Sequence, residues 1–419
     1  MPQIRALIPL LIAAGILIGG NGMQGTYIPL RGAYEGFSVT LIGIIGAGYS
    51  LGFAIGCIYI TRLLRAIGHI RLFAALAAIA ASASLSMALL IDPAFWFLMR
   101  FLTGICVAGL FATVESWINA KVTNQTRART LSIYRFVDLF SVTAGQYLIP
   151  VAGIPGFAAF AVISMATTLS LVPISIADKS SPAPPGAVKF DVRTIWQVSP
   201  LAVVGVVVVG LTMAAFRYVG PLYASNVGFS VAEVASFMSA GIIGGVVLQY
   251  PLGHFSDRID RRKILLVTTA GALIAGLYLA IGAGNSEWRN IAGVFIFGAF
   301  AMPLYSLCSA HANDFAKDGQ HASIAAGLLF FWSVGATIGP FLASVMLQFF
   351  GPHALFWYTS VIQAAFIGYT VYRMSARAAI PAGERRSRFR ALLRTSLYFS
   401  KLATPPAERD GGRKSGPSD

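Results

Sequence analysis

Ionisable side chains interrupt the apolar stretches of this 419-residue chain at four places where they could carry protons or charge: Arg100, Glu115, Arg135 and Asp138. A charge is costly in apolar surroundings, so such residues usually pair with one another or face a water-filled cavity. Asp138 follows Arg135 by one helical turn and lies roughly 13 Å into its stretch, which makes it the best candidate for a proton carrier. A structural salt bridge and direct contact with a substrate are the alternative roles of Asp138.

Glu115 and Arg135 come to similar depth when both are counted from the loop around Asn124. If their stretches are adjacent antiparallel helices, we expect them to form an ion pair. That pair is either a fixed structural contact or a gate that forms and breaks as the molecule changes shape. Arg100, in a different stretch, either faces the interior or extends its long side chain to the nearer surface.

Arg217 is an isolated cation in the second half of the chain, because no carboxylate stands near it in the sequence. Its partner is either an anionic or carbonyl-rich substrate, or the side chain is a membrane-surface anchor beside Tyr218 and Tyr223. Amides also occur inside apolar stretches, where their hydrogen bonds either join helices or line a cavity. These amides are Asn21, Gln24, Gln146 and Gln249.

The elements that must position these residues are long apolar runs. Hydrophobic residues make up 56% of the chain and charged residues 11%, and the mean hydropathy is +0.72. A helix needs about 20 apolar residues to cross the roughly 30 Å hydrocarbon core of a bilayer, and continuous apolar runs favour helices over strands. Twelve runs qualify, at residues 6–30, 38–60, 70–91, 94–119, 130–153, 156–177, 199–223, 230–252, 263–284, 290–312, 322–347 and 353–374. The sequence therefore predicts an all-α membrane protein with twelve transmembrane helices.

The chain divides at residues 178–198, a long break with a core rich in proline and serine. This segment predicts a cytoplasmic linker between an N-terminal six-helix bundle, residues 1–177, and a C-terminal six-helix bundle, residues 199–374. Residues 375–419 form a basic tail, for which an amphipathic helix on anionic lipid and a disordered segment are both open. The apolar face of that helix would comprise Phe389, Leu392, Leu393 and Leu397.

Lys and Arg give the chain a net charge of +15 and gather in alternate loops between the runs. Because cytoplasmic loops of membrane proteins carry most of the cations, this pattern places both termini in the cytoplasm. The charge is then a topology signal, and cations dispersed among helix ends do not make a nucleic-acid-binding surface. The expected location is a bacterial-type inner (plasma) membrane, crossed many times.

The two halves are related by an internal repeat. Residues 29–39 align without gaps with residues 221–231, and six of eleven positions are identical at an offset of 192. A change to an offset of 194 then pairs Gly104 with Gly298. Repeats of this kind build two bundles related by a pseudo-two-fold axis, which rock about a midplane site in alternating access.

A charged loop joins the eighth and ninth runs, with four cations and two acids between Gly253 and Lys263. The loop resembles the signature of the major facilitator superfamily, G-x-x-x-D-R-x-[GD]-R-R-[KR], through Gly253, Asp257, Arg258, Asp260, Arg261 and Arg262. The resemblance implies that Asp257 caps the N-terminus of a neighbouring helix and that the arginines bridge the two halves. Arg65 stands in the corresponding place in the first half, so we expect an asymmetric gate.

Other segments extend this resemblance over residues 1 to about 375. Arg100 to Gly109 fits the pattern R-x-x-x-G-x-x-x-[AG]-[AG], in which the Arg of the superfamily is implicated in proton coupling. Drug antiporters would have Gly-Pro where this chain has Gly145-Gln146, so import and export are both open. The segments that look like the YcaD-like branch are 114–119, 304–314, which adds Tyr305 to the cavity candidates, and 335–340.

Four polar residues lie near cytoplasmic ends of the runs, where we expect gate hydrogen bonds: Asn119, His311, Asn313 and Asp314. One His beside one carboxylate lacks a ligand set, so we expect neither a metal site nor a cofactor. The sequence has no phosphate-binding loop, H-E-x-x-H motif or nucleophile elbow, and no enzymatic activity is predicted.

The sequence therefore predicts a monomeric secondary transporter, surrounded by membrane lipid and coupled to protons, that moves a small organic solute. The aromatic content of 12% and the helix amides suit an amphipathic solute such as a drug or a vitamin. The alternatives are a facilitated-diffusion uniporter and a membrane sensor that keeps a transporter fold without moving solute.

Overall fold

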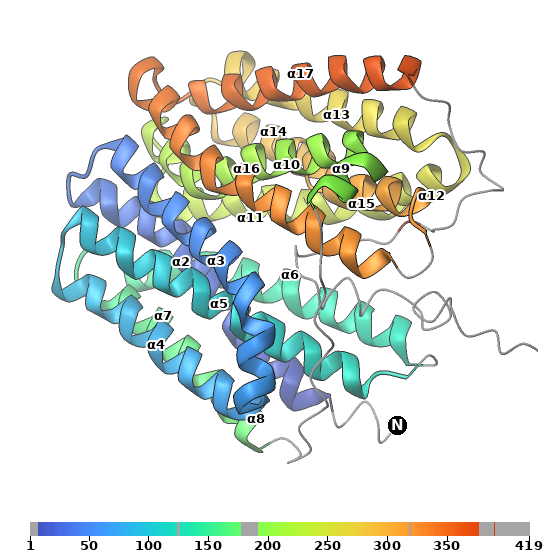
Figure 1. Ribbon diagram of the computed structural model, residues 1–419. Coiled ribbons are helices and arrows are strands. Elements are labelled where there is room, and N and C mark those ends of the chain that lie inside the picture. The colour runs from blue at the N-terminus through green and yellow to red at the C-terminus, as the bar shows by residue number, and fades with distance from the viewer. Residues whose placement is uncertain (1–6, 124–125, 177–191, 318–319, 377–388, 390–419) are drawn as a thin grey trace, which may run out of the picture.

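The structure is a computed structural model that describes residues 7–123, 126–176, 192–317, 320–376 and 389. In these residues the regular elements are helices joined by short loops (Figure 1). The N-terminal half contains α2 (Ile8–Tyr34), α3 (Val39–Ile67), α4 (His69–Leu89), α5 (Pro93–Lys121), α6 (Arg127–Ala152), α7 (Ala158–Leu169) and α8 (Leu171–Ile176). The C-terminal half contains α9 (Val192–Val198), α10 (Pro200–Asn226), α11 (Val231–Val247), α12 (Gln249–Arg258), α13 (Arg261–Leu277), η1 (Tyr278–Gly282), α14 (Glu287–Ala301), α15 (Leu304–Asp314), α16 (His321–Phe350) and α17 (Ala354–Ala376).

Some crossings consist of two helices in succession, and proline accounts for two of the breaks. The break between α11 and α12 lies just before Pro251, which has no N–H to donate to the Val247 carbonyl. The break between α14 and α15 contains Pro303, which likewise cannot donate to Ala299. Each such pair forms one bent crossing, as do α7 with α8 and α13 with η1.

Eleven helical segments in the described part of the chain are long and apolar enough to cross a membrane. The 26-residue α6 is not among them, because it carries Arg135 and Asp138 within its length. It coincides with the predicted fifth run and packs among the others. The helices therefore follow the twelve predicted runs, and the predicted all-α membrane fold is confirmed.

The repeat has a structural basis in two equivalent turns. Gly36 and Gly228 have φ angles of 79° and 100°, a region that glycine adopts without strain. Two residues later, Ser38 and Ser230 cap α3 and α11, each side-chain oxygen accepting a backbone N–H three residues on. The identical Gly-Phe-Ser-Val segments thus specify the same helix start twice.

The two halves also pack alike. α2 contacts α6, α3 contacts α5 and α4 contacts α7, just as α10 contacts α16, α11 contacts α14 and α13 contacts α17. Gly104 lies directly against the carbonyl of Tyr49, and Gly298 lies in the same way against the carbonyl of Gly241. A side chain at either glycine would collide with the facing backbone, so the predicted pairing of Gly104 with Gly298 has a common packing role.

The halves meet on the face opposite that on which α2 begins and α17 ends. There α3 packs against α16, α6 against α11 and α2 against α10. Gln348 Oε1 accepts hydrogen bonds from the backbone N and the Oγ1 of Thr40 at 2.9 and 2.6 Å. The hydroxyls of Tyr147 and Ser236 lie 3.4 Å apart. We call this region, with the close contact of Gly43 and Ser344, the inter-half seam.

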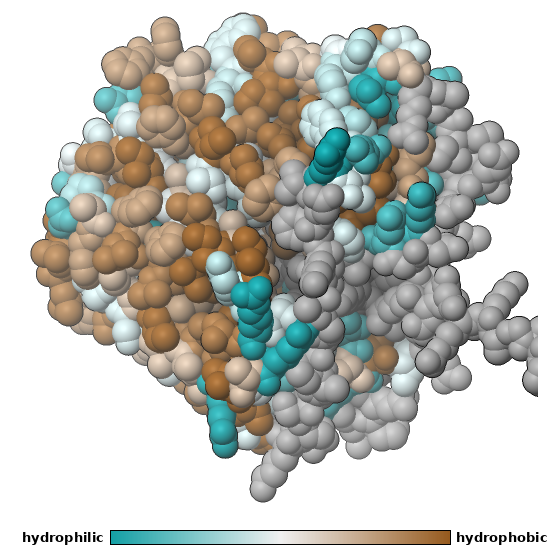
Figure 2. All heavy atoms as spheres, viewed as in Figure 1, coloured by the Kyte–Doolittle hydropathy of each residue, from teal (hydrophilic) through white to brown (hydrophobic). Residues whose placement is uncertain are grey.

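Large apolar side chains cover much of the lateral surface, and the most hydrophilic residues gather toward the side of α9 and α12 (Figure 2). Val151, Trp288 and Phe349 are 84%, 77% and 73% exposed. An apolar surface of this extent is unfavourable in water and favourable against lipid tails. The chain is accordingly a multi-pass membrane protein.

Residues 192–198 of the predicted linker form the helix α9, while residues 177–191 lie outside the described residues. The tail also lies outside them, apart from residues 375–376 and Phe389. The predicted linker, the bundle boundaries and the amphipathic tail helix therefore stay predictions.

Candidate functional site

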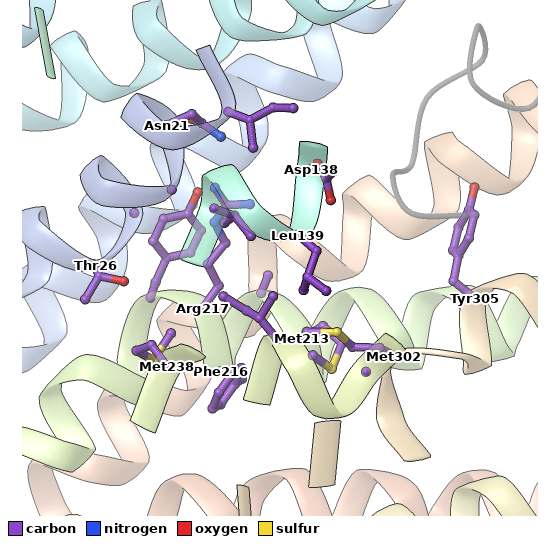
Figure 3. Close-up of a pocket in the computed structure, with 18 of the residues that line it drawn as sticks. Asn21, Thr26, Asp138, Leu139, Met213, Phe216, Arg217, Met238, Met302 and Tyr305 are labelled. Carbon is purple, nitrogen blue, oxygen red and sulfur yellow. The ribbon is translucent and has the colours of Figure 1, made fainter. Parts of the chain in front are cut away.

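A cavity of about 330 Å³ lies between the halves (Figure 3). Its wall draws on α2, α3, α5 and α6 in one half and on α10, α11, α12, α15 and α16 in the other. Both repeats therefore contribute to one cavity.

Five of the six predicted cavity residues line this wall: Asn21, Gln146, Arg217, Gln249 and Tyr305. Asp138, predicted as a proton carrier, lines it as well. The sixth candidate, Gln24, is 2% exposed and donates from Nε2 to Ser84 Oγ on α4 at 2.8 Å. Gln24 therefore joins two helices and does not line this cavity, because its side chain is directed at α4.

The wall amides are held in place by bonds to neighbouring helices. Asn21 Oδ1 accepts a hydrogen bond from the Tyr49 hydroxyl at 2.9 Å. Gln146 Nε2 donates to the Gly22 carbonyl at 3.2 Å, and Gln249 Nε2 donates to Ser306 Oγ at 3.3 Å. The sequence left two alternatives for these amides, joining helices or lining the cavity. Each of the three side chains does both.

The remaining wall is largely apolar and deformable. Methionine fills irregular space with little preference for shape, and aromatic rings offer flat surfaces to a ligand. These side chains are Met213, Met238, Met302, Phe53, Phe111, Phe216 and Trp332. Sequence analysis did not find them, because nothing marks a few residues out of 10 methionines and 29 phenylalanines.

Arg217 projects from α10 into the cavity, where its side chain is exposed (Figure 3). Its guanidinium carbon lies 6.0 Å from the centre of the Tyr218 ring, and its head is close to Gly25 on α2. Tyr218 is 3% exposed and Tyr223 is fully buried. The alternative of a surface anchor is therefore wrong for all three residues.

Arg100 is also interior, with 1% of its surface exposed, so it does not extend to the membrane surface. Its guanidinium carbon lies 4.3 Å from the centre of the Tyr49 ring and 5.9 Å from that of Tyr218. Its Nε and Nη1 atoms are buried without a hydrogen-bond partner. Nothing in the sequence marked Tyr49 as a partner of Arg100, and sequence analysis suggested Tyr218 only as a surface neighbour of Arg217.

Asp138 is half-buried on the cavity wall of α6. Glu115 on α5 is fully buried and accepts a hydrogen bond from the Tyr134 hydroxyl at 3.3 Å. Tyr134 immediately precedes Arg135, which is half-buried on the same helix. The Glu115 carboxylate is thus held by a hydroxyl of α6, and the predicted ion pair between Glu115 and Arg135 stays a prediction.

Arg261 organises the charged loop between α12 and α13. It is 2% exposed and donates from Nε to Asp314 Oδ2 at 2.6 Å and from Nη1 to Ser256 Oγ at 2.9 Å. Its Nη2 lies 3.0 Å from Asp257 Oδ1. These contacts join α12, α13 and α15 within the C-terminal half, which differs from the expected bridge between halves. Arg258, by contrast, is exposed.

Asp260, rather than Asp257, caps the helix that follows the loop. It directly precedes α13 and accepts the backbone N–H of Arg262 at 3.0 Å. Arg262 also pairs with it, with Nη2 2.8 Å from Asp260 Oδ2. Burial raises the pKa of the Asp260 carboxyl, but the hydrogen bonds from Arg262 outweigh burial and hold that pKa below its usual value.

Asp257 lies in the last turn of α12 and accepts the backbone N–H of Phe389 at 2.7 Å. The Phe389 ring lies directly against Gly253, where a side chain would collide with it. In this arrangement the Asp257 carboxylate contacts the Phe389 N–H and the cation of Arg261, and its expected role as the cap of a neighbouring helix stays a prediction. The glycine of the motif leaves room for the aromatic ring.

The predicted gate residues lie at the ends of α5 and α15. Asn313 donates from Nδ2 to the Ser309 carbonyl at 2.8 Å, and its Oδ1 lies 2.8 Å from Nδ1 of His321 on α16. The His311 ring packs edge-on against Phe315, and Asn119 is half-buried. In the described ranges, no three His, Cys, Asp or Glu residues come together as metal ligands would.

The sequence model of the Major Facilitator Superfamily matches residues 10–288 and 202–406. The uncharacterized MFS-type transporter YcaD of Escherichia coli O45:K1 (strain S88 / ExPEC) is 22% identical over 351 residues, which span 83% of this chain and 91% of YcaD. An uncharacterized MFS-type transporter of Enterobacter sp. (strain 638) is 22% identical over 357 residues, which span 84% of this chain and 91% of that transporter.

Two solved structures have the same fold. A mutant of the nucleoside transporter NupG superposes with a TM-score of 0.78 at 10% identity, covering 88% of this chain and 99% of that one. A bacterial homologue of the human lysosomal transporter Spinster, in an inward-facing and unoccupied conformation, superposes with a TM-score of 0.68 at 13% identity. The superposition covers 97% of this chain and 99% of that one. With its two matching helical halves and the cavity between them, the chain belongs to the Major Facilitator Superfamily, in the YcaD-like group, and serves membrane transport of a solute.

Proposed function

We propose that this protein is a proton-coupled secondary transporter that moves a small amphipathic organic solute through the cavity by alternating access. The observation that carries the proposal is the cavity wall, which draws on both halves and combines charged and amide groups with methionine and aromatic side chains. Such a wall suits a solute with a polar head and a flat apolar body. A space of about 330 Å³ is of the size that small ligands occupy.

The inter-half seam supplies the contact that would have to open and close. If both termini are cytoplasmic, as the cations predict, the seam lies on the outer side and the cavity is reached from the cytoplasm. Alternation would then separate Thr40 from Gln348 and bring the cytoplasmic helix ends together. Gly43 supports such a reversible seam, because it lets α3 approach Ser344 on α16 without an intervening side chain.

Asp138 is the proposed proton carrier. Within the described lining it is the acidic residue that reaches the cavity, and it is half-buried there. A carboxyl couples solute movement to protons only if it takes up and releases a proton in contact with the transport path. Glu115 is fully buried against Tyr134, so we assign it a supporting role between α5 and α6.

Proton movement in vesicles tests this proposal. The reconstituted protein, with a pH-sensitive dye inside the vesicles, receives a panel of metabolites, vitamins and drugs outside. Interior acidification by a compound identifies a symported solute, and alkalinisation identifies an exchanged one. Asp138→Asn should abolish coupled flux and leave solute exchange measurable, while Glu287→Gln, in the first turn of α14 and away from the cavity lining, should behave as the parent protein.

Each result has a defined meaning. Unchanged coupled flux in Asp138→Asn would exclude this residue as the carrier. Solute movement without any proton movement would make the protein a uniporter. No movement of any compound by either route would support the sensor alternative.

A further inference from the structure

We propose that the cavity contains an oxyanion subsite at Arg217, so that the transported solute is an amphipathic organic anion with a carboxylate head. This inference rests on the proposed function and names its substrate class. Two cations, Arg217 and Arg100, flank the Tyr218 ring at the cavity wall.

Arg217 is a cation without a counter-charge in the described residues. Its side chain is exposed to the cavity, and its contact there is with the Tyr218 ring, at 6.0 Å from ring centre to guanidinium carbon. Other buried arginines have a carboxylate close by, as Arg31, Arg261 and Arg262 do in their ion pairs. A guanidinium in a membrane interior is costly unless a carboxylate or water-filled space compensates it. At Arg217 that compensation is left to whatever occupies the cavity.

Arg100 adds a second positive charge behind the same wall. Its guanidinium carbon lies 5.9 Å from the centre of the Tyr218 ring, so both cations flank one tyrosine. It is 1% exposed, and its Nε and Nη1 have no hydrogen-bond partner. The interaction between two charges is stronger in a low-dielectric interior than in water, so Arg100 strengthens the attraction for an anion placed at Arg217.

The groups around Arg217 suit a planar carboxylate. A guanidinium offers parallel N–H donors that match the two oxygens of a carboxylate. Asn21 uses its Oδ1 to accept from Tyr49, which leaves its amide N–H groups to face the cavity. Behind this head group, Met213, Met238 and Phe216 provide an apolar surface for the body of the solute (Figure 3).

The subsite also explains why transport would be coupled to a proton. Asp138 lies on the same cavity wall but on α6 (Figure 3). An organic monoanion that moves together with one proton carries no net charge across the membrane. The pairing of a cationic head-group site with an acidic wall residue therefore favours anion–proton symport.

The test uses the full-length protein in detergent and pairs of compounds that share one apolar body and differ only in the head group, an anionic carboxylate or a neutral amide. Benzoate, phenylacetate, 2-naphthoate and indole-3-carboxylate are each compared with the corresponding primary amide in thermal-shift titrations at constant ionic strength. We expect at least one carboxylate to raise the unfolding temperature saturably while its amide does not. Arg217→Gln should weaken that binding about tenfold or more, because charged hydrogen bonds are lost.

Two variants control for folding and for general charge effects. Arg217→Lys keeps the cation but loses the planar fork, so it should bind more weakly than the parent and more tightly than Arg217→Gln. Arg289→Gln removes an exposed cation near the start of α14 and should bind as the parent does. A lack of any carboxylate-specific response across the panel overturns the subsite, as does equal binding to Arg217→Gln and the parent.

Flux of the same compounds into vesicles separates this inference from the proposed function. A carboxylate that binds through Arg217 but is never moved would retain the subsite and contradict transport of that solute class. Movement of the amides at the rate of the carboxylates would retain transport and overturn the subsite.

Discussion

The guanidinium carbon of Arg100 lies 4.3 Å from the centre of the Tyr49 ring, and the Tyr49 hydroxyl donates to Asn21 on the cavity wall. Tyr49 thus links an arginine that is 1% exposed to a polar group that faces the solute. The ring face of an aromatic side chain attracts a cation, most strongly where water is absent. This contact holds a charge in the interior that has no carboxylate among the described residues.

Two variants of Tyr49 should separate the contribution of its ring to stability from the contribution of its hydroxyl to solute binding. Tyr49→Leu removes the cation–π contact and should lower the free energy of unfolding by about 2 kcal/mol, because the Arg100 charge loses its compensation. Tyr49→Phe keeps the ring, so stability should stay close to that of the parent. Its solute KM should rise, because Asn21 loses its bond to the hydroxyl. Thermal unfolding in detergent and flux measurements provide the two readouts, and equal stability of the two variants would refute the role of the ring.

The charged loop offers a matched pair of arginines. Arg261 is 2% exposed and contacts Ser256, Asp257 and Asp314, whereas Arg258 is exposed on the same loop. Arg261→Gln should destabilise the protein by about 3 kcal/mol, because it removes the cation beside the buried Asp314 carboxylate. Arg258→Gln should change stability by less than about 0.5 kcal/mol. Chemical denaturation monitors both, and similar losses would show that the loop acts by net charge.

The cap at Asp260 should make stability depend on pH. Its pKa is lower in the folded protein than its usual value, so the folded state favours the charged form. The stabilisation is therefore present above the unfolded pKa and is lost as the pH falls through the folded one. The difference in unfolding temperature between the parent and Asp260→Asn should be constant above about pH 5 and should shrink progressively as the pH falls below the usual pKa of an aspartate. A difference that persists at the acidic end would contradict this origin.

Periodicity and composition predicted the helices well, because a bilayer demands long apolar runs with self-satisfied backbones. The repeat was also visible, since Gly36 and Ser38 recur as Gly228 and Ser230 for reasons of local geometry. The cavity amides were found because a polar side chain is conspicuous in an apolar run. Methionine and phenylalanine of the wall were not found, since lipid-facing and cavity-facing residues have the same composition.

Partner choice was harder to predict than position. The family resemblance assigned Asp257 the cap of a neighbouring helix, whereas its contacts here are with the Phe389 N–H and with Arg261. Gln24 resembled the other amides in sequence, and Ser84, 60 residues away, decides its role. Such contacts depend on which faces of helices meet, and a single sequence does not record this information.

Alternating access is tested most directly by locking the inter-half seam. In a variant without Cys57, Cys106 and Cys308, cysteines replace Thr40 and Gln348, whose side chains lie 2.6 Å apart between Oγ1 and Oε1. A reducible bifunctional thiol reagent joins them, and flux of a solute identified in the vesicle assay is measured before and after reduction. We expect cross-linking to stop flux and reduction to restore it, with either single cysteine unaffected. Full flux through the cross-linked protein would contradict transport by separation of the two halves.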